Sequence, residues 1–243
     1  MRTAIILFLL VFAFPAAAQQ VDGRDVDTEV AALLEQIGGR DVWAEARGFH
    51  MVEILHAAHF DLPAIREYWV DFEQPRIMEK TTTNAIHGLQ ALNLDQGWTL
   101  RARDAGAGML TEWDAQAVTG WRSFWPGIPT RVFHLLASND PSVEARALHD
   151  HRLDIFVDGT FAVWIAMDAN ARPVAYGRSE SHTETHFLGA YETYGPVELW
   201  STAYEPGDEW AVTMVDYTLY TEEMPVSYDP PSNFSNFDPD DAS

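Results

Sequence analysis

The chain contains no cysteine, a single lysine and few basic side chains, and each shortage excludes a kind of chemistry. Without cysteine it has no disulfides, no thiolate catalysis, no cysteine-ligated zinc and no lipid-modified N-terminal cysteine. Because Lys80 is the only lysine, Schiff-base chemistry has one candidate, and a phosphate-binding loop lacks its lysine at the required position. The 243 residues carry 15 Lys+Arg against 37 Asp+Glu, a formal net charge of -22. Nucleic-acid phosphates would repel this chain, and charge alone would not hold it on an anionic membrane.

What the chain does contain is enough apolar material for a packed core. Hydrophobic residues make up 47% of it and aromatic residues 12%, which excludes a wholly disordered chain. The length allows one large domain or two small ones, but no internal repeat or interdomain linker is present. Beyond residue 225 the composition changes to Pro, Ser, Asn and Asp, so residues 226–243 are predicted to be a disordered acidic tail.

The N-terminus has the pattern of a secretory signal peptide. Arg2 precedes the apolar run 4–14, Pro15 ends that run, and Ala16-Ala17-Ala18 supplies a cleavage site. The run is too short for a membrane span, which needs roughly 20 residues. We therefore expect residues 1–18 to be cleaved near Ala18 and the mature chain to begin at Gln19. The expected location is a bacterial periplasm, with no transmembrane segment in the mature chain.

Apolar periodicity predicts one helix, a series of strands and a helical insert. Val30, Leu33, Leu34 and Ile37 form one apolar stripe of a helix that Gly38-Gly39 ends. From residue 49 the apolar period changes to two, and strands are predicted at 49–56, 64–72, 76–82, 86–94, 98–103, 153–157, 161–167, 172–178, 182–191, 197–204 and 210–221. Short connections between these strands require antiparallel neighbours. Two short aromatic helices are predicted within 111–137, with Thr111 and Asp114 forming the start of the first.

This order predicts the α+β class: a large antiparallel sheet covered by an N-terminal helix and a helical insert. A sheet of about ten strands is near the limit for an open sheet, so it must curl into an incomplete barrel. The concave face then needs a cover, and the aromatic helices of 111–137 are the natural candidates. We expect a half-barrel domain over residues 19–225.

Several short motifs, taken in order, resemble the outer-membrane lipoprotein-sorting (LolA-like) superfamily. They are the helix end Ile37–Trp43, the hairpin Asp95–Trp98, the strand pair Asp154–Pro173, the segment Thr185–Val197 and the final strand Asp216–Leu219. The resemblance covers roughly residues 29–222, and its motifs are weak singly. It implies a half-barrel closed by helices that binds lipid or lipoprotein acyl chains without catalysis and without a cofactor. The implied partners are a lipid or lipidated protein and outer-membrane or envelope proteins.

The chain also departs from that family. The arginine that holds the carrier's lid closed has no clear equivalent, although Arg66 and Arg76 lie on suitable strands, and the charge is more acidic than in the carrier. If the hollow exists, we expect it to be lined by Trp113, Trp121, Phe124, Phe133 and Leu136 from the helices and by Trp69 and Trp164 from the sheet. The alternative is that these residues are ordinary core, and the filled barrel is a protein-binding or sensory module.

A second alternative is a metal-dependent enzyme. On a strand, His182, Glu184 and His186 would share one face, and two imidazoles with a carboxylate suffice for zinc or iron. At ~3.3 Å per residue the outer two would lie about 13 Å apart, so a further ligand from elsewhere would be needed. The chain has no nucleophile elbow and no dinucleotide or phosphate loop, so we do not expect an enzyme.

Overall fold

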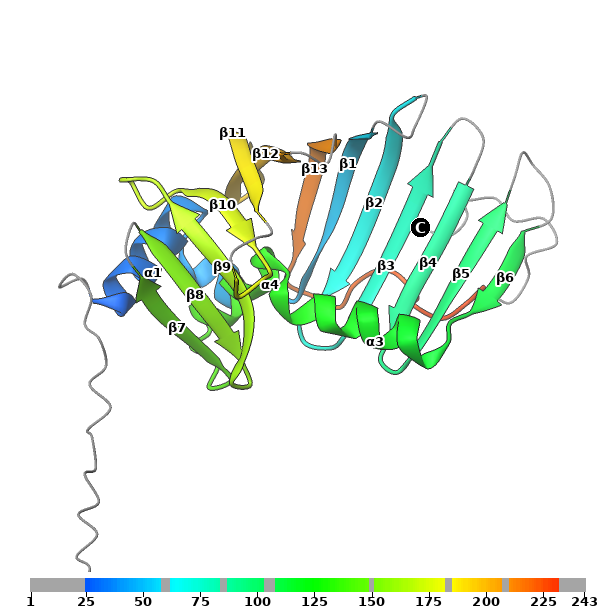
Figure 1. Cartoon of the computed structure of the whole chain (residues 1–243), viewed down its shortest axis with the longest axis horizontal. Coiled ribbons are helices and arrows are strands. Elements are labelled where there is room, and N and C mark those ends of the chain that lie inside the picture. Colours follow the sequence, from blue (N-terminus) through cyan, green and yellow to red (C-terminus); the bar gives the residue numbers. More distant parts are fainter. Residues whose placement is uncertain are drawn as a thin grey trace, which may run out of the picture.

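The computed structural model describes residues 25–57, 62–83, 87–102, 108–148, 151–181, 185–206 and 210–231. Within them lies one 13-stranded antiparallel sheet, curled but not closed into a barrel (Figure 1). The predicted α+β class with a curled antiparallel sheet is therefore confirmed. The predicted signal peptide 1–18, His182, Glu184 and residues 232–243 of the predicted tail lie outside the described residues.

The sheet consists of two meanders that meet at a central seam. The first meander contains β1 (Gly48–Ala57), β2 (Ala64–Asp71), β3 (Arg76–Thr82), β4 (His87–Asn93), β5 (Gln96–Ala102) and β6 (Met109–Glu112). The second contains β7 (Val143–Leu148), β8 (Arg152–Val157), β9 (Thr160–Met167), β10 (Pro173–Gly177), β11 (His186–Tyr194), β12 (Val197–Glu205) and β13 (Trp210–Tyr220). The strands follow sequence order in each half, and β1 pairs with β13 to join them.

Three helices pack on one face of the sheet, which is called the concave face here. They are α1 (Val26–Gln36), α2 (Arg40–Ala44) and α4 (Pro129–Ala137). The predicted stripe of α1 is buried in the main core, as are Trp43 of α2 and Phe133 of α4, whose rings meet edge to face at 5.3 Å. Gly38 has a positive φ, and a Cβ there would lie 2.7 Å from the Pro196 carbonyl oxygen. Glycine thus allows the end of α1 to press against the β11–β12 turn.

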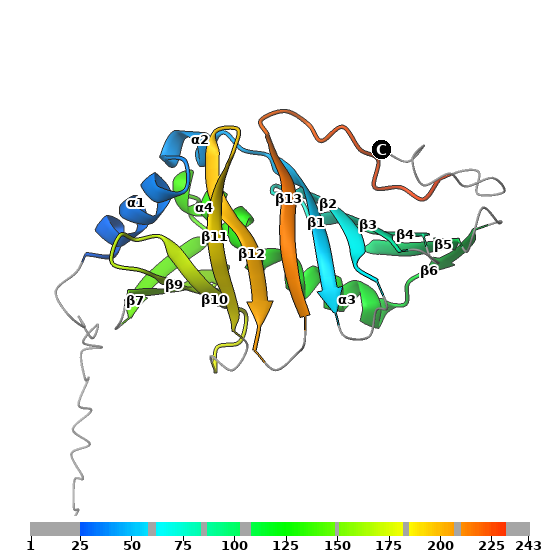
Figure 2. The ribbon, with the colours of Figure 1, turned by 90° about the horizontal axis from the view of Figure 1, so that it is seen from above.

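The opposite, convex face of the first meander is covered by the chain that follows β13 (Figure 2). Trp98 Nε1 donates to the Tyr228 carbonyl oxygen at 2.9 Å, and Asn93 Nδ2 donates to Asp229 Oδ1 at 2.8 Å. Met224, Val226 and Tyr228 pack there against a second apolar cluster of the sheet. Composition predicts disorder from residue 226, and for residues 226–231 this is wrong. The polar composition conceals the apolar side chains that cover Trp98 and its neighbours.

Two short strands and one helix start differ from the prediction. β6 and β7 flank the helical insert and were not predicted. Thr111 belongs to β6, whereas the N-cap of α3 (Ala115–Phe124) is Asp114, whose carboxylate accepts from the Ala117 amide at 2.8 Å. Across the described ranges, no helix has the length and apolar character needed to cross a membrane.

Candidate functional site

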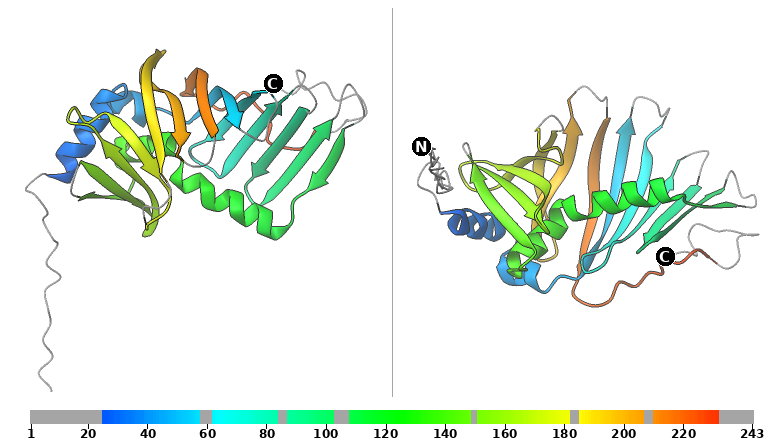
Figure 3. Two further views of the ribbon diagram at one scale, coloured as in Figure 1. Left: turned by 45° about the horizontal axis from the view of Figure 1, so that its top comes forward. Right: turned by 60° about the horizontal axis from the view of Figure 1, so that its bottom comes forward.

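Helix α3 crosses the concave face of the curled sheet from one side to the other (Figure 3). It begins beside β4 and β5 and runs into η1, the short 3-10 helix Trp125–Gly127, which packs against β9. A Cβ at Gly127 would lie 2.5 Å from the Ala162 carbonyl oxygen, so this contact is close. None of the residues of α3 is buried, in contrast to α4, which is almost wholly buried. The helix therefore lies over the sheet as a strap rather than as part of the packed core.

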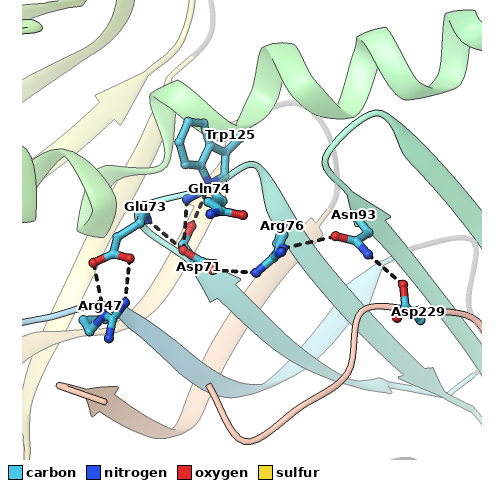
Figure 4. Close-up of polar contacts among 8 residues, drawn as sticks. All are labelled: Arg47, Asp71, Glu73, Gln74, Arg76, Asn93, Trp125 and Asp229. Atoms are coloured by element: carbon cyan, nitrogen blue, oxygen red, sulfur yellow. Dashed lines mark hydrogen bonds and ion pairs between the residues drawn. The ribbon is translucent and has the colours of Figure 1, made fainter. Parts of the chain in front are cut away.

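The end of this strap is fixed to the turn between β2 and β3 (Figure 4). Trp125 Nε1 donates to the Asp71 carbonyl oxygen at 2.7 Å, and Arg131 Nε donates to the Phe72 carbonyl oxygen at 3.0 Å. The Arg131 guanidinium also lies 3.5 Å from the centre of the Trp125 ring, a cation–π contact. Burial lowers the pKa of Arg131 to about 10, which leaves it charged at neutral pH.

The start of the strap is held by aromatic contacts. The Trp113 ring lies on β5 at Gly97, where a Cβ would overlap it, and Trp113 Nε1 donates to Thr99 Oγ1 at 2.7 Å. Trp121 lies 5.3 Å from Trp113 between ring centres, and Phe124 lies 6.4 Å from Trp121. Phe124 is 40% exposed. Aromatic side chains of the strap thus remain partly accessible to solvent.

A second aromatic group joins Phe133 of α4 to four side chains on the strands of the other meander. Ring centres follow one another from Phe133 to Trp200 at 6.4 Å, from Trp200 to Tyr176 at 6.2 Å, from Tyr176 to His186 at 4.7 Å and from His186 to Trp210 at 5.5 Å. We call these five residues the aromatic row. Trp200 and Tyr176 are partly buried and pack against the main core, so the row borders the core where it meets solvent.

Between the strap and the aromatic row, the concave face of β1–β4 carries polar side chains. The strand register places Tyr68, Glu79 and Gln90 side by side on β2, β3 and β4. Glu79 accepts from Thr81 Oγ1 at 2.8 Å and from Gln90 Nε2 at 3.0 Å. Two further members, Glu53 of β1 and Arg66 of β2, are register partners and form an ion pair. We call Glu53, Arg66, Tyr68, Glu79 and Gln90 the polar group.

Burial dominates the electrostatics of the polar group. It raises the pKa of Glu53, and the ion pair with Arg66 opposes that rise. The pKa of Tyr68 is raised well above its ordinary value by burial first and then by the negative charge of Glu79. The positive charge of Arg66, whose guanidinium lies 5.4 Å from the centre of the Tyr68 ring, opposes that rise. The Tyr68 hydroxyl is therefore a neutral hydrogen-bonding group at physiological pH.

The structure brings some of the predicted hollow residues together and separates others. Trp113, Trp121 and Phe124 lie together at the strap, while Phe133 and Leu136 are buried in the core on α4. The two predicted sheet residues do not face the strap. Trp69 is on the convex face, stacked on His50 at 4.6 Å and packed in the cluster that Tyr228 covers. Trp164 alternates with Val163 and Ile165, which point into the main core, so it lies on the other face of β9.

The polar group and most of the aromatic row were not predicted. Tyr68 is adjacent to the predicted Trp69, and alternation along β2 puts the two side chains on opposite faces. Whether Tyr68 or Trp69 faces the strap depends on which face of the sheet the helices cover. The apolar pattern of β2 alone does not indicate that face.

The metal alternative is not tested, because His182 and Glu184 lie outside the described residues. The third member, His186, is buried between the rings of Tyr176 and Trp210. The described part of the chain contains no group of three or more His, Asp or Glu side chains that could hold a metal ion.

Comparisons with known proteins give weak likenesses to solved structures and none to a family model or a curated protein. Among solved structures, the chain is similar to a DUF1329 family protein from Desulfovibrio piger, with a TM-score of 0.34 and 7% sequence identity. The likeness covers 79% of this chain and 91% of the other. A likeness this weak carries no argument about function.

Proposed function

We propose that the protein binds the acyl chain of a lipid or lipidated protein on the concave face, between the strap α3 and the aromatic row, and carries it without covalent chemistry. The observation that supports this most is that α3 crosses this face with none of its residues buried. Its Trp121, together with Tyr176 and Trp200 across the face, is only partly buried. Apolar and aromatic surfaces left accessible on a concave face are typical of sites for apolar ligands.

The driving force in this proposal is burial of the acyl chain. Each methylene removed from water contributes about 0.8 kcal/mol, so a sixteen-carbon chain would gain on the order of 10 kcal/mol before the costs of association. The strap is fixed at both ends by aromatic contacts, but its middle contributes no buried side chain. A ligand inserted beneath it would therefore cover apolar surface without displacing packed core.

The sequence resemblance to the LolA-like superfamily supports the same proposal. Under it, the predicted signal peptide directs the protein to the periplasm, where lipids and lipidated proteins cross between membranes. The partners would then be a lipid or lipidated protein and outer-membrane or envelope proteins.

Native mass spectrometry tests the proposal on mature, untagged protein exported to a bacterial periplasm, combined with organic extraction of bound molecules. We expect an acyl lipid at about one per chain. Trp121→Ala should reduce retention of that lipid more than it lowers the melting temperature. Ile65→Ala, which removes a 47% exposed apolar side chain on the face of β2 that carries Trp69, is the control and should leave retention unchanged.

Two results would contradict the proposal. One is a bare protein mass in every preparation, which would favour a filled barrel that binds another protein. The other is a large loss of melting temperature in Trp121→Ala with unchanged lipid retention, which would make Trp121 ordinary core. A mass raised by one metal ion would instead support the enzyme alternative.

A further inference from the structure

The position of the strap over the concave face depends on what holds its ends, because α3 has no buried residue of its own. At the end formed by η1, the Asp71 carbonyl oxygen accepts from Trp125 Nε1 at 2.7 Å. The Asp71 side chain shapes the turn between β2 and β3, since its Oδ1 atom accepts from the backbone amides of Glu73 at 2.8 Å and of Gln74 at 3.0 Å. Contacts that fix Asp71 therefore also fix this end of the strap.

A chain of polar contacts runs from Asp71 to residues 222–231 on the convex face, which we call the C-terminal segment (Figure 4). Arg76 Nη1 lies 3.7 Å from Asp71 Oδ2, and Arg76 Nε donates to Asn93 Oδ1 at 3.1 Å. Asn93 Nδ2 donates in turn to Asp229 Oδ1 at 2.8 Å. Arg76 and Asn93 are register partners on β3 and β4. Asp229 thus stabilises the orientation of Asn93 that keeps Arg76 beside Asp71.

The C-terminal segment reaches the same strand ends a second time, through an apolar contact. A Cβ at Gly48 would lie 2.7 Å from Met224 Sδ and 2.4 Å from the Val70 carbonyl oxygen, so Met224 packs closely against the start of β1. Gly48 is the register partner of Asp71. The segment therefore supports the strand pair that ends in the strap-holding turn through Met224 as well as through Asp229.

The C-terminal segment is held by side chains and not by a strand ladder. None of its residues belongs to a strand, and it stays on the convex face through packed side chains and the hydrogen bonds with Trp98 and Asn93. A terminal segment held in this way opens at a lower free energy than the sheet unfolds. Its detachment would break the polar chain at Asp229 and leave the sheet intact.

We infer that the C-terminal segment is a clasp for the strap: while it lies on the convex face it keeps the turn at Asp71 in the position that holds Trp125, and its detachment loosens the strap on the opposite face. Access to the concave face is then controlled from the convex face. The inference concerns the movement of the strap, so it goes beyond the proposed function and does not depend on which ligand the concave face binds.

Hydrogen exchange of the mature protein, followed by mass spectrometry, measures the opening of the strap in peptides that cover α3. A helix of 10 residues is marginal without its contacts, so a loosened strap unfolds locally and its amides exchange. Tyr228→Ala weakens the clasp, and we expect the α3 amides to exchange about fivefold faster, as for the loss of roughly one hydrogen bond. Leu34→Ala, which removes a fully buried side chain of α1, is the control for lost core packing and should not reproduce this rise.

Trypsin gives a second readout of the same opening. Arg122 is the only basic residue of α3, and cleavage after it requires the helix to open. Cleavage should therefore become faster in Tyr228→Ala by about the same factor as exchange. Neither readout uses a ligand, so the acyl-binding proposal keeps its own separate test.

Two variants act on the polar chain itself. Asp229→Ala serves in case Tyr228→Ala does not fold, because it removes the acceptor of Asn93 without removing a packed side chain, and it should give a smaller rise in α3 exchange. Arg76→Gln breaks the chain at its centre, so adding Tyr228→Ala to it should have a smaller effect than in the unmodified protein. An undiminished effect there would overturn the transmission through Arg76.

Two results would overturn the clasp as a whole. One is unchanged exchange and cleavage of α3 in a variant whose residues 222–231 exchange faster, since the segment would then have detached without loosening the strap. The other is an equal rise in Leu34→Ala, which would show that α3 responds to global stability and not to the C-terminal segment.

Discussion

Tyr228 lies on the convex face, in the segment that follows β13, and is only 6% exposed. Its ring packs in the cluster that contains Trp69, Met78 and Trp98. Among the described residues, the buried Tyr228 hydroxyl has no hydrogen-bond partner, and burial raises its pKa. The ring and the hydroxyl should therefore have opposite effects on stability: the ring stabilises by burial, whereas the hydroxyl is desolvated without compensation.

Two substitutions separate these effects. Tyr228→Ala removes a buried aromatic side chain, for which core substitutions cost about 3–5 kcal/mol. The low end, about 3 kcal/mol, is expected because the Tyr228 carbonyl keeps the hydrogen bond from Trp98 Nε1. At about 2–4 °C per kcal/mol for a chain of this size, the melting temperature should fall by roughly 6–12 °C. Tyr228→Phe keeps the ring and should be neutral or slightly stabilising.

Urea denaturation followed by tryptophan fluorescence measures both variants, with Tyr204→Ala as the exposed control. The midpoint should fall clearly for Tyr228→Ala and stay within error for Tyr228→Phe. An unchanged midpoint in Tyr228→Ala would refute the packing of this segment on the sheet. A loss in Tyr228→Phe as large as in Tyr228→Ala would show that the hydroxyl has a partner and that the reasoning about burial is wrong.

Two further predictions concern the strap and a turn. Gly97→Ala should lower the free energy of unfolding by about 1–3 kcal/mol and shift the fluorescence of Trp113, because the new Cβ overlaps that ring. Gly88→Ala is the control: a Cβ there meets its nearest atom at 3.9 Å, so the loss of stability should be smaller. Equal losses in the two variants would contradict the contact between Trp113 and Gly97. Hydrogen bonds from the backbone amides of Arg172 and then Asn170 lower the pKa of Asp168. Asp168 therefore stabilises the fold above pH about 4, and this contribution is lost as pH falls through its folded-state pKa. Between pH 7 and pH 3 the melting temperature of Asp168→Asn should fall less than that of the unmodified protein. Equal falls in the two proteins would refute the stabilising role of the Asp168 carboxylate.

The sequence predicts the larger elements because their periodicity is long enough to detect. β3 is predicted and observed at residues 76–82, and the stripe of α1 is buried as expected. β6 and β7 are missed because each is short and adjoins the helical insert, where a few apolar residues fit helix or strand equally. Segment 226–231 is missed because its two packed apolar side chains, Val226 and Tyr228, stand among Ser, Asp and Pro.

The candidate site is less predictable, since it depends on contacts between distant strands. Trp113 and Trp121 could be found from the sequence because one short segment carries both. Glu79, in contrast, is one of 37 acidic residues, and nothing local distinguishes it. Its position opposite Tyr68 follows from the register of β2 and β3, and a shift by one residue would send it to the convex face.

The seam between β1 and β13 also determines how the chain can fold. Met51 pairs with Tyr217, so the centre of the sheet is built from the first and last strands. Each meander consists of local hairpins that can form early, but they cannot be joined until nearly the whole chain is available. Pairing β1 with β13 closes a loop of most of the chain, and the entropy of that loop is lost before the contacts of the seam form. Folding is therefore expected to be slow. Until the seam closes, β1 presents an unpaired edge, and this partly folded state is the one most exposed to aggregation.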